Sequence, residues 1–169
     1  MKSARKKSGS NTNAMSKNDS MGNVNKTENK FFIDGNYHKV TVSQILEMKK
    51  RNEKAAFVTA YDYSNALICD KAGVDGVLVG DSAAMVMLGY HDTTRIGMQE
   101  MLVFCGGVCR AVRRALIIAD MPFGSYQGSV ANAIHNAVLF IKAGCNAVKI
   151  EGGGEVVPLI RSIVAAGIP

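Results

Sequence analysis

One pattern recurs four times along the chain and limits the folds that it can adopt. Each copy begins with a short apolar run, continues with a carboxylate and a polar or glycine-rich turn, and ends with a helical segment. The apolar runs lie at residues 55–60, 76–79, 116–119 and 147–150. They lack the alternation of a half-buried strand, and a helix follows each one, which predicts a parallel sheet buried on both faces.

Helices are predicted between and after these strands, with glycines at several of their ends. The expected ranges are 64–72, 98–114, 129–143 and 155–166. A shorter amphipathic helix is predicted before the first strand, at residues 41–50, because Thr41 and Gln44 fit a capping box. The chain is therefore an α/β protein built from four βα units.

Two architectures fit this pattern, a doubly wound sheet and a (β/α)₈ barrel. The phosphate-binding sequences GxGxxG and GxxxxGK[ST] are absent, and the carboxylates fall at strand ends, where barrel enzymes build their sites. An open sheet also uses its carboxyl edge, so both remain open. A full barrel needs about 250 residues. We therefore expect residues 31–169 to be the truncated N-terminal half of a barrel.

Most of the net charge of +6 lies in residues 1–30, which carry seven Lys or Arg and two acids. This segment is rich in Ser, Asn and Lys and has almost no apolar residues, so we predict a disordered basic tail. A tail that binds nucleic acid or a membrane surface is the alternative. The tail lacks the aromatic residues that stack on single-stranded bases, and we predict no nucleic-acid partner.

The four cysteines have no CxxC spacing and lie in apolar surroundings. We expect buried free thiols in a reducing cytoplasm. Cys105 and Cys109 share a helix face, but no histidine lies nearby to complete a metal site. The basic start is not followed by the apolar stretch of a signal peptide, and no run is long enough to span a membrane. We predict a cytoplasmic protein without a membrane partner.

Three carboxylates follow successive strands: Asp81, Asp120 and Glu151. In a parallel sheet all three point toward one mouth. Hard oxygen ligands that converge on an open site suit Mg²⁺, which keeps positions for water or substrate. The alternative is that each carboxylate only caps the helix that follows it.

Lys149 lies two residues before Glu151 and therefore shares its face of the strand. A lysine in a buried strand needs a partner, so it either meets a substrate carboxylate or forms an internal ion pair with one of the acids. Ser82 either hydrogen-bonds a substrate oxygen or caps a helix, and Asp62 is ambiguous in the same way. His91 lies in a long loop from which it could approach the site.

Four segments, FVTAYDYS at 57–64, VGDS at 79–82, ADMPF at 119–123 and VKIEGG at 148–153, closely resemble the ketopantoate hydroxymethyltransferase family. The resemblance runs from about residue 40 to residue 169. It implies a (β/α)₈ barrel of the phosphoenolpyruvate/pyruvate type and a decamer-like homo-oligomer. The helix that starts at Thr41 resembles the family's N-terminal helix, which closes the barrel bottom.

The resemblance also implies an activity in pantothenate biosynthesis. The family transfers a hydroxymethyl group from 5,10-methylenetetrahydrofolate to 3-methyl-2-oxobutanoate and gives 2-dehydropantoate. By resemblance, Asp81, Asp120 and Glu151 hold Mg²⁺, and Asp81, Ser82, Asp120 and Lys149 bind the keto acid. The family's general base is a glutamate expected beyond Pro169, so we predict that this fragment is inactive alone.

Two other functions stay open from the sequence. One is a related Mg²⁺-dependent, enolate-forming barrel lyase or mutase, although those enzymes usually carry a cysteine loop where this chain has 121–124, MPFG. The other is a non-enzymatic half-barrel with a nucleic-acid-binding tail. One departure from the family is His91, which stands where an aspartate is usual.

Overall fold

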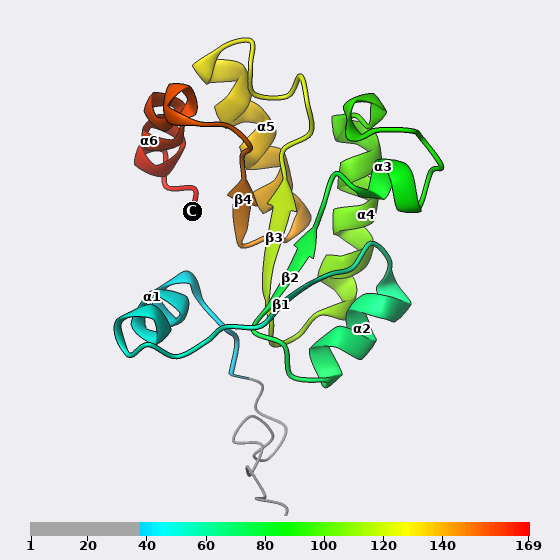
Figure 1. Ribbon diagram of the computed structural model, residues 1–169, viewed down its shortest axis with the longest axis vertical. Coiled ribbons are helices and arrows are strands. Elements are labelled where there is room, and N and C mark those ends of the chain that lie inside the picture. Colours follow the sequence, from blue (N-terminus) through cyan, green and yellow to red (C-terminus); the bar gives the residue numbers. More distant parts are fainter. Residues whose placement is uncertain (1–37) are drawn as a thin grey trace, which may run out of the picture.

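A computed structural model describes residues 38–169, and the four apolar runs form one parallel four-stranded sheet (Figure 1). The strands are β1 (Phe57–Thr59), β2 (Gly76–Val79), β3 (Leu116–Asp120) and β4 (Ala147–Lys149). Each strand pairs with the next one along the chain, in the order β1-β2-β3-β4. This order never reverses direction, as it would at the switch point of a doubly wound sheet, so the sheet has the strand order of a barrel.

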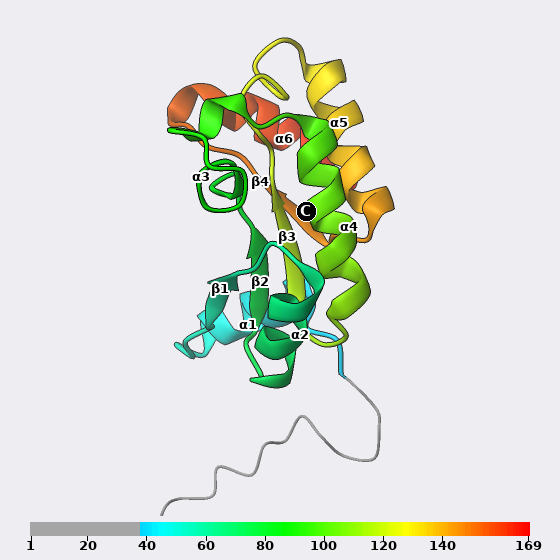
Figure 2. The ribbon, with the colours of Figure 1, turned by 90° about the vertical axis from the view of Figure 1, so that its right-hand side faces the viewer.

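The helices between the strands pack side by side in chain order and cover one face of the sheet (Figure 2). They are α2 (Tyr63–Lys71), α4 (Met98–Ala111), α5 (Val130–Ala143) and α6 (Val157–Ala165). The helix α1 (Val42–Lys50) lies near the start of the strands instead (Figure 1). Its predicted capping box is present, because Gln44 N donates to Thr41 Oγ1 and Thr41 N donates to Gln44 Oε1.

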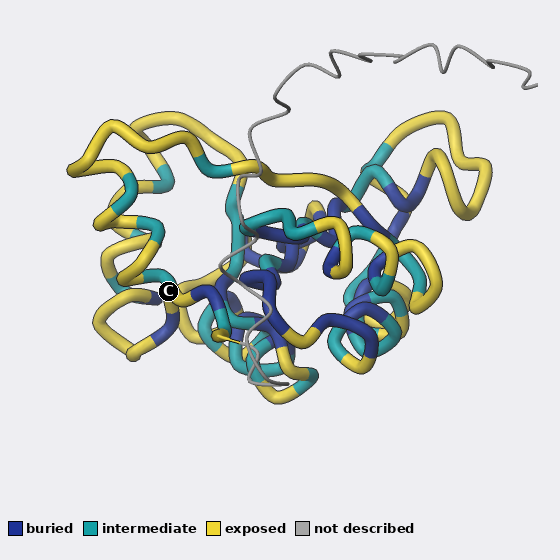
Figure 3. Tube along the Cα trace, turned by 90° about the horizontal axis from the view of Figure 1, so that it is seen from below, coloured by how far each residue is buried: buried dark blue, intermediate teal, exposed yellow. Residues whose placement is uncertain are grey.

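The core lies between the two central strands and the helices, where the buried segments gather in Figure 3. Small and branched residues of β2 and β3 meet α4 and α5 there: Val77, Val79, Ile117, Ala119, Met101, Val108, Ala133, Ala137 and Phe140. β1 is exposed along its whole length. At the other edge of the sheet, Val148 N donates to Pro169 O at 3.0 Å, so the chain after α6 returns alongside β4.

A buried charged network joins the end of α2 to the start of β3. The Asp70 carboxylate accepts hydrogen bonds from the backbone N–H groups of Arg113 at 2.7 Å, Arg114 at 3.1 Å and Ala115 at 2.8 Å. The Arg114 side chain is 1% exposed and donates to the carbonyl oxygens of Gly73 and Val74. The Asp70 carboxylate therefore supplies the acceptors for the turn that leads into β3.

This network explains why α4 ends at Ala111 and not at residue 114, as the sequence pattern predicted. The backbone N–H groups of residues 113–115 donate to the Asp70 carboxylate instead of to helix carbonyls. The loop after β2 also differs from the prediction, because it contains the short helix α3 (Ala83–Val86) and the 3₁₀ helix η1 (Thr93–Arg95). A second 3₁₀ helix, η2 (Gly154–Val156), precedes α6 and delays its start.

Among the described residues, no helix combines the length and the apolar character that a membrane span requires. The basic tail predicted at 1–30, and the predicted start of ordered structure at Phe31, lie outside the described residues.

Candidate functional site

The carboxyl ends of β2, β3 and β4 bring the three predicted acids to one edge of the sheet. Asp120 is the last residue of β3 and pairs in register with Lys149 on β4, while Asp81 and Glu151 follow the ends of β2 and β4. Asp120 is 4% exposed, and its Oδ2 accepts a hydrogen bond from the backbone N–H of Asp81 at 3.1 Å. The ends of β2 and β3 are therefore joined directly at the site.

Lys149 lies between two of these acids. Its Nζ is 2.9 Å from Asp120 Oδ1 and 3.0 Å from Glu151 Oε1, so the predicted internal ion pair is confirmed. Burial alone would lower the pKa of the Lys149 ammonium, but the hydrogen bonds and charges of Asp120 and Glu151 outweigh it and raise the pKa. The Lys149 side chain remains 41% exposed, which leaves the ammonium accessible to a ligand.

The third acid, Asp81, lies in an unfavourable electrostatic environment. Burial raises the pKa of its carboxyl, and the nearby negative charges of Asp120 and Glu151 raise it further. A hydrogen bond from the Thr93 side chain and the charge of Lys149 act in the opposite direction without cancelling the effect. The site therefore concentrates more negative charge than Lys149 neutralises.

Of the two residues that could each be a helix cap, Asp62 caps its helix with its side chain and Ser82 does not. Ser82 precedes α3 but makes no capping hydrogen bond, and its Oγ lies 2.9 Å from the Tyr61 hydroxyl. Asp62 is the N-cap of α2 and accepts from Asn65 N at 2.9 Å, so its capping role is confirmed. A Cβ at Gly80 would lie 2.7 Å from Ser82 Oγ, so a side chain at position 80 would force the Ser82 hydroxyl to move.

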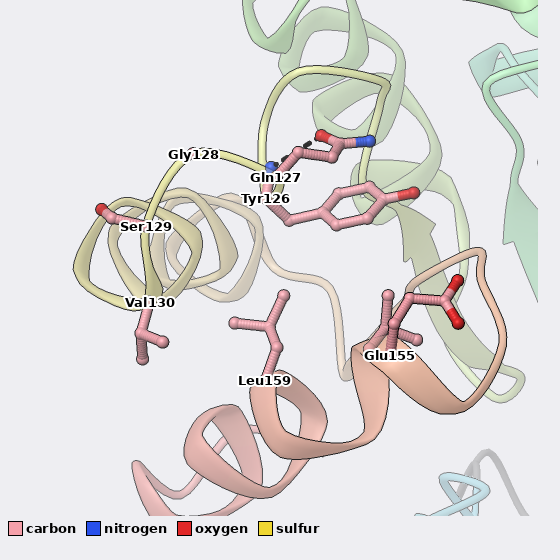
Figure 4. Close-up of a pocket in the computed structure, with 8 residues that line it drawn as sticks. Tyr126, Gln127, Gly128, Ser129, Val130, Glu155 and Leu159 are labelled. Carbon is pink, nitrogen blue, oxygen red and sulfur yellow. Dashed lines mark hydrogen bonds between the residues drawn. The ribbon is translucent and has the colours of Figure 1, made fainter.

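Tyr126 is a site residue that the sequence did not reveal. Its hydroxyl donates to Glu151 O at 3.0 Å and so holds the loop that carries the third acid. The same side chain lines a pocket of about 370 Å³ between the loop before α5 and the start of α6. Figure 4 shows Tyr126 and Leu159 on opposite sides of this pocket. No local pattern marks Tyr126, because its bond joins two loops from different βα units.

Within residues 38–169, no group of three or more His, Cys, Asp or Glu side chains has the arrangement of a metal site. Lys149 separates Asp120 from Glu151, so an ammonium is the cation that these acids contact. The donor set still fits Mg²⁺, because the acids supply hard oxygens and the group that the buried Asp120 Oδ1 contacts is already a cation, the Lys149 ammonium. His91 is exposed and makes no hydrogen bond to the described site residues.

Replacing Asp81 with asparagine should stabilise the metal-free chain at neutral pH. The pKa of the Asp81 carboxyl is higher in the folded chain than in the unfolded chain, so this group ionises more easily when the chain is unfolded. The folded protein therefore loses stability as the pH rises from the unfolded pKa through the folded pKa. The free energy of unfolding at pH 7 should rise by about 0.5 kcal/mol, because solvent screens a half-buried charge. The gain should shrink as the pH falls toward the unfolded value of about 3.9.

Urea unfolding followed by circular dichroism measures this change. Asp92→Asn is the matched control, because hydrogen bonds from Thr94 lower the pKa of Asp92 and its replacement should not stabilise. A loss of stability in Asp81→Asn at pH 7 would contradict the electrostatic account of the site.

Several solved structures with a similar fold are barrel enzymes. Phosphonopyruvate hydrolase superposes with a TM-score of 0.60 at 19% identity, over 75% of this chain and 48% of that one. 2,3-dimethylmalate lyase, a member of the PEP mutase/isocitrate lyase superfamily, superposes with a TM-score of 0.57 at 18% identity, over 73% of this chain and 47% of that one. These similarities confirm the predicted fold: the described residues form a partial (β/α)₈ barrel of the phosphoenolpyruvate/pyruvate type.

Sequence comparison is more specific than the fold. The relative from Moorella thermoacetica, named 3-methyl-2-oxobutanoate hydroxymethyltransferase, is 52% identical over 132 residues, which are 78% of this chain and 49% of the relative. A relative with the same name from Nitrosopumilus maritimus is 51% identical over 129 residues, which are 76% of this chain and 46% of the relative. The chain spans about half the length of these relatives. The model of the family described as ketopantoate hydroxymethyltransferase matches residues 39–169, and the chain therefore belongs to that family.

Proposed function

We propose that this chain carries the metal- and keto-acid-binding part of a 3-methyl-2-oxobutanoate hydroxymethyltransferase. The reaction transfers a hydroxymethyl group from 5,10-methylenetetrahydrofolate to 3-methyl-2-oxobutanoate and gives 2-dehydropantoate. The observation that carries the proposal is Lys149, an accessible ammonium held between Asp120 and Glu151 at the strand ends. The relatives are about half identical in sequence over the matched region, and their names support the same activity.

The site offers complementary groups for a 2-oxo acid. The Lys149 ammonium pairs with the substrate carboxylate, since a charge-assisted hydrogen bond is among the strongest contacts a protein can make. Ser82, whose hydroxyl is held by Tyr61, hydrogen-bonds a substrate oxygen. The backbone bond between Asp81 and Asp120 keeps these groups at one mouth of the barrel.

Asp81, Asp120 and Glu151 would hold Mg²⁺, directly or through water. When bound, the ion would polarise the ketone and ease removal of the C3 proton. An ion also relieves the mutual repulsion that raises the pKa of Asp81. A protein of similar fold, phosphonopyruvate hydrolase, has been solved in complex with oxalate and Mg²⁺, a pairing of the same chemical kind.

The base that removes the C3 proton is a separate group. Asp120 is paired with Lys149, and all three acids are assigned to the cation, so none is free to accept that proton. By family resemblance the base is a glutamate in the second half of the family's barrel, outside the region that this chain matches. The homo-oligomer implied by the resemblance and the cytoplasmic location predicted from the sequence stay predictions.

Lys149→Ala tests the proposal through binding, which does not require turnover. Titration calorimetry should detect binding of 3-methyl-2-oxobutanoate that depends on Mg²⁺. The substitution should weaken it about 10- to 100-fold, as expected for the loss of one charge-assisted hydrogen bond. Lys71→Ala removes an exposed lysine at the end of α2 and should leave the affinity unchanged.

Two further arms separate specific binding from general attraction of anions. 3-methylbutanoate lacks the keto oxygen and should bind more weakly than the keto acid in the presence of Mg²⁺. Circular dichroism should show that Lys149→Ala keeps the fold. Binding that is indifferent to Mg²⁺, or unaffected by Lys149→Ala, would remove the support for the proposal.

A further inference from the structure

Three of the four cysteines meet near the start of β4, at the opposite end of the strands from the acids. Cys105 and Cys109 lie one turn apart on α4, and Cys145 lies between α5 and β4. The Sγ atoms of Cys109 and Cys145 are 3.7 Å apart. The arrangement joins two elements that are 36 residues apart in the chain. The fourth, Cys69, lies on α2 and makes no hydrogen bond with another thiol among the described residues.

The C-terminal cap of α5 creates this contact. Gly144 has a φ of +108°, which favours glycine, and it reverses the chain directly over Cys109. A Cβ at Gly144 would lie 3.0 Å from Cys109 Cβ and 3.3 Å from its Sγ. The cap therefore presses against α4 and places the next residue, Cys145, beside Cys109.

Metal binding does not explain the cluster, because no group of three potential ligands in the described residues is arranged for an ion. We propose that Cys109 and Cys145 form a reversible intramolecular disulfide when the protein meets hydrogen peroxide. A disulfide needs its sulfurs at about 2.05 Å. The two sulfurs must therefore approach by roughly 1.7 Å, through rotation of both side chains about their Cα–Cβ bonds and a small shift of the cap.

The step balances as a two-electron oxidation. Peroxide oxidises the Cys109 thiol to a sulfenic acid and releases one water. The Cys145 sulfur then attacks the Cys109 sulfur, the S–S bond forms and the hydroxyl leaves as a second water. Cys109 reacts first because it is half-buried, whereas Cys145 and Cys105 are buried.

The surroundings make this pair slow to oxidise. The neighbouring Cys145 thiol and burial raise the pKa of Cys109, while the Lys39 ammonium favours its thiolate without cancelling the shift. The Cys105 thiol is the first cause of the raised pKa of Cys145. A low thiolate fraction protects the thiols at low peroxide levels, so the response belongs to sustained oxidation.

Peptide mapping of the purified chain tests the proposal. After millimolar peroxide and alkylation of free thiols, the digest should contain a linked Cys109–Cys145 peptide, two hydrogen atoms lighter than the two free peptides together. Dithiothreitol should reverse the link. The oxidised chain should melt roughly 5–10 °C higher, because the cross-link closes a 36-residue separation in the unfolded chain.

Variants and an unfolded control make the test decisive. Cys109→Ala and Cys145→Ala should each abolish the link and the rise in melting temperature, whereas Cys69→Ser should keep both. In urea the same treatment should give mixed pairings among the four cysteines. A native digest dominated by Cys105–Cys145, by links between chains, or by sulfinic and sulfonic acids would overturn the proposal, as would a native pattern equal to the unfolded one.

Discussion

Replacing Asp70 with alanine should lower the free energy of unfolding by about 3–5 kcal/mol. The carboxylate is 5% exposed and accepts hydrogen bonds from three successive backbone N–H groups. Each buried donor left without a partner costs about 1–3 kcal/mol. The substitution also removes a negative charge that interacts with the Lys39 ammonium, which adds to the loss.

Denaturant unfolding of the two variants Asp70→Ala and Asp70→Asn measures this effect. Asparagine keeps one acceptor oxygen, so its loss should be smaller than that of alanine. Glu47→Ala serves as the control, because the Glu47–Lys50 ion pair is well exposed and should be worth less than about 1 kcal/mol. A loss in Asp70→Ala no larger than in Glu47→Ala would show that Asp70 does not hold the turn into β3.

Turnover by residues 1–169 alone should be at least about 10²- to 10⁴-fold slower than turnover by the same residues continued into the rest of the family's barrel. Loss of a general base typically costs that much, and the acids of the described site are committed to Lys149 and the proposed cation. The exposed β1 strand adds a second reason, since barrel strands need neighbours on both sides to fill the interior.

A chimaera provides the comparison. Residues 1–169 are joined to the second half of the Moorella thermoacetica relative, which is 52% identical over the matched half. Keto-acid-dependent consumption of 5,10-methylenetetrahydrofolate is then measured for both proteins at equal concentration. The chimaera assayed without 3-methyl-2-oxobutanoate sets the background. Comparable turnover with and without the second half would mean that a residue of this chain, with His91 the first to test, acts as the base.

The strands and most of the site could be predicted because their signals are local. Unalternated apolar runs mark β2 and β3, and the period of a strand places Lys149 on the face of Glu151, where the ion pair is found. The same reasoning could not decide whether Ser82 is a cap, since a serine after a strand fits both roles. The Tyr61 hydroxyl at 2.9 Å decides it only in three dimensions.

The rest could not be predicted because the partners are distant in the chain. Asp70 reads as a polar residue near a helix end, yet its acceptors serve N–H groups 43 to 45 residues later. The end of α4 was therefore predicted three residues too late. Nor does the sequence show that Lys149 keeps Asp120 and Glu151 apart, which is why three acids at strand ends do not yet form a ligand cage.

The sequential strand order has a consequence for how the protein is made. Each new strand docks beside the one synthesised just before it, so each pairing closes the helical connection of a single unit, and the preceding strand is already present as its partner. The hydrogen bond from Val148 N to Pro169 O continues the same order, because it places the chain after α6 beside β4. Folding can therefore follow translation from one end of the sheet to the other. While a ribosome pauses between two units, the last strand formed would present an unpaired edge to which the next strand can add.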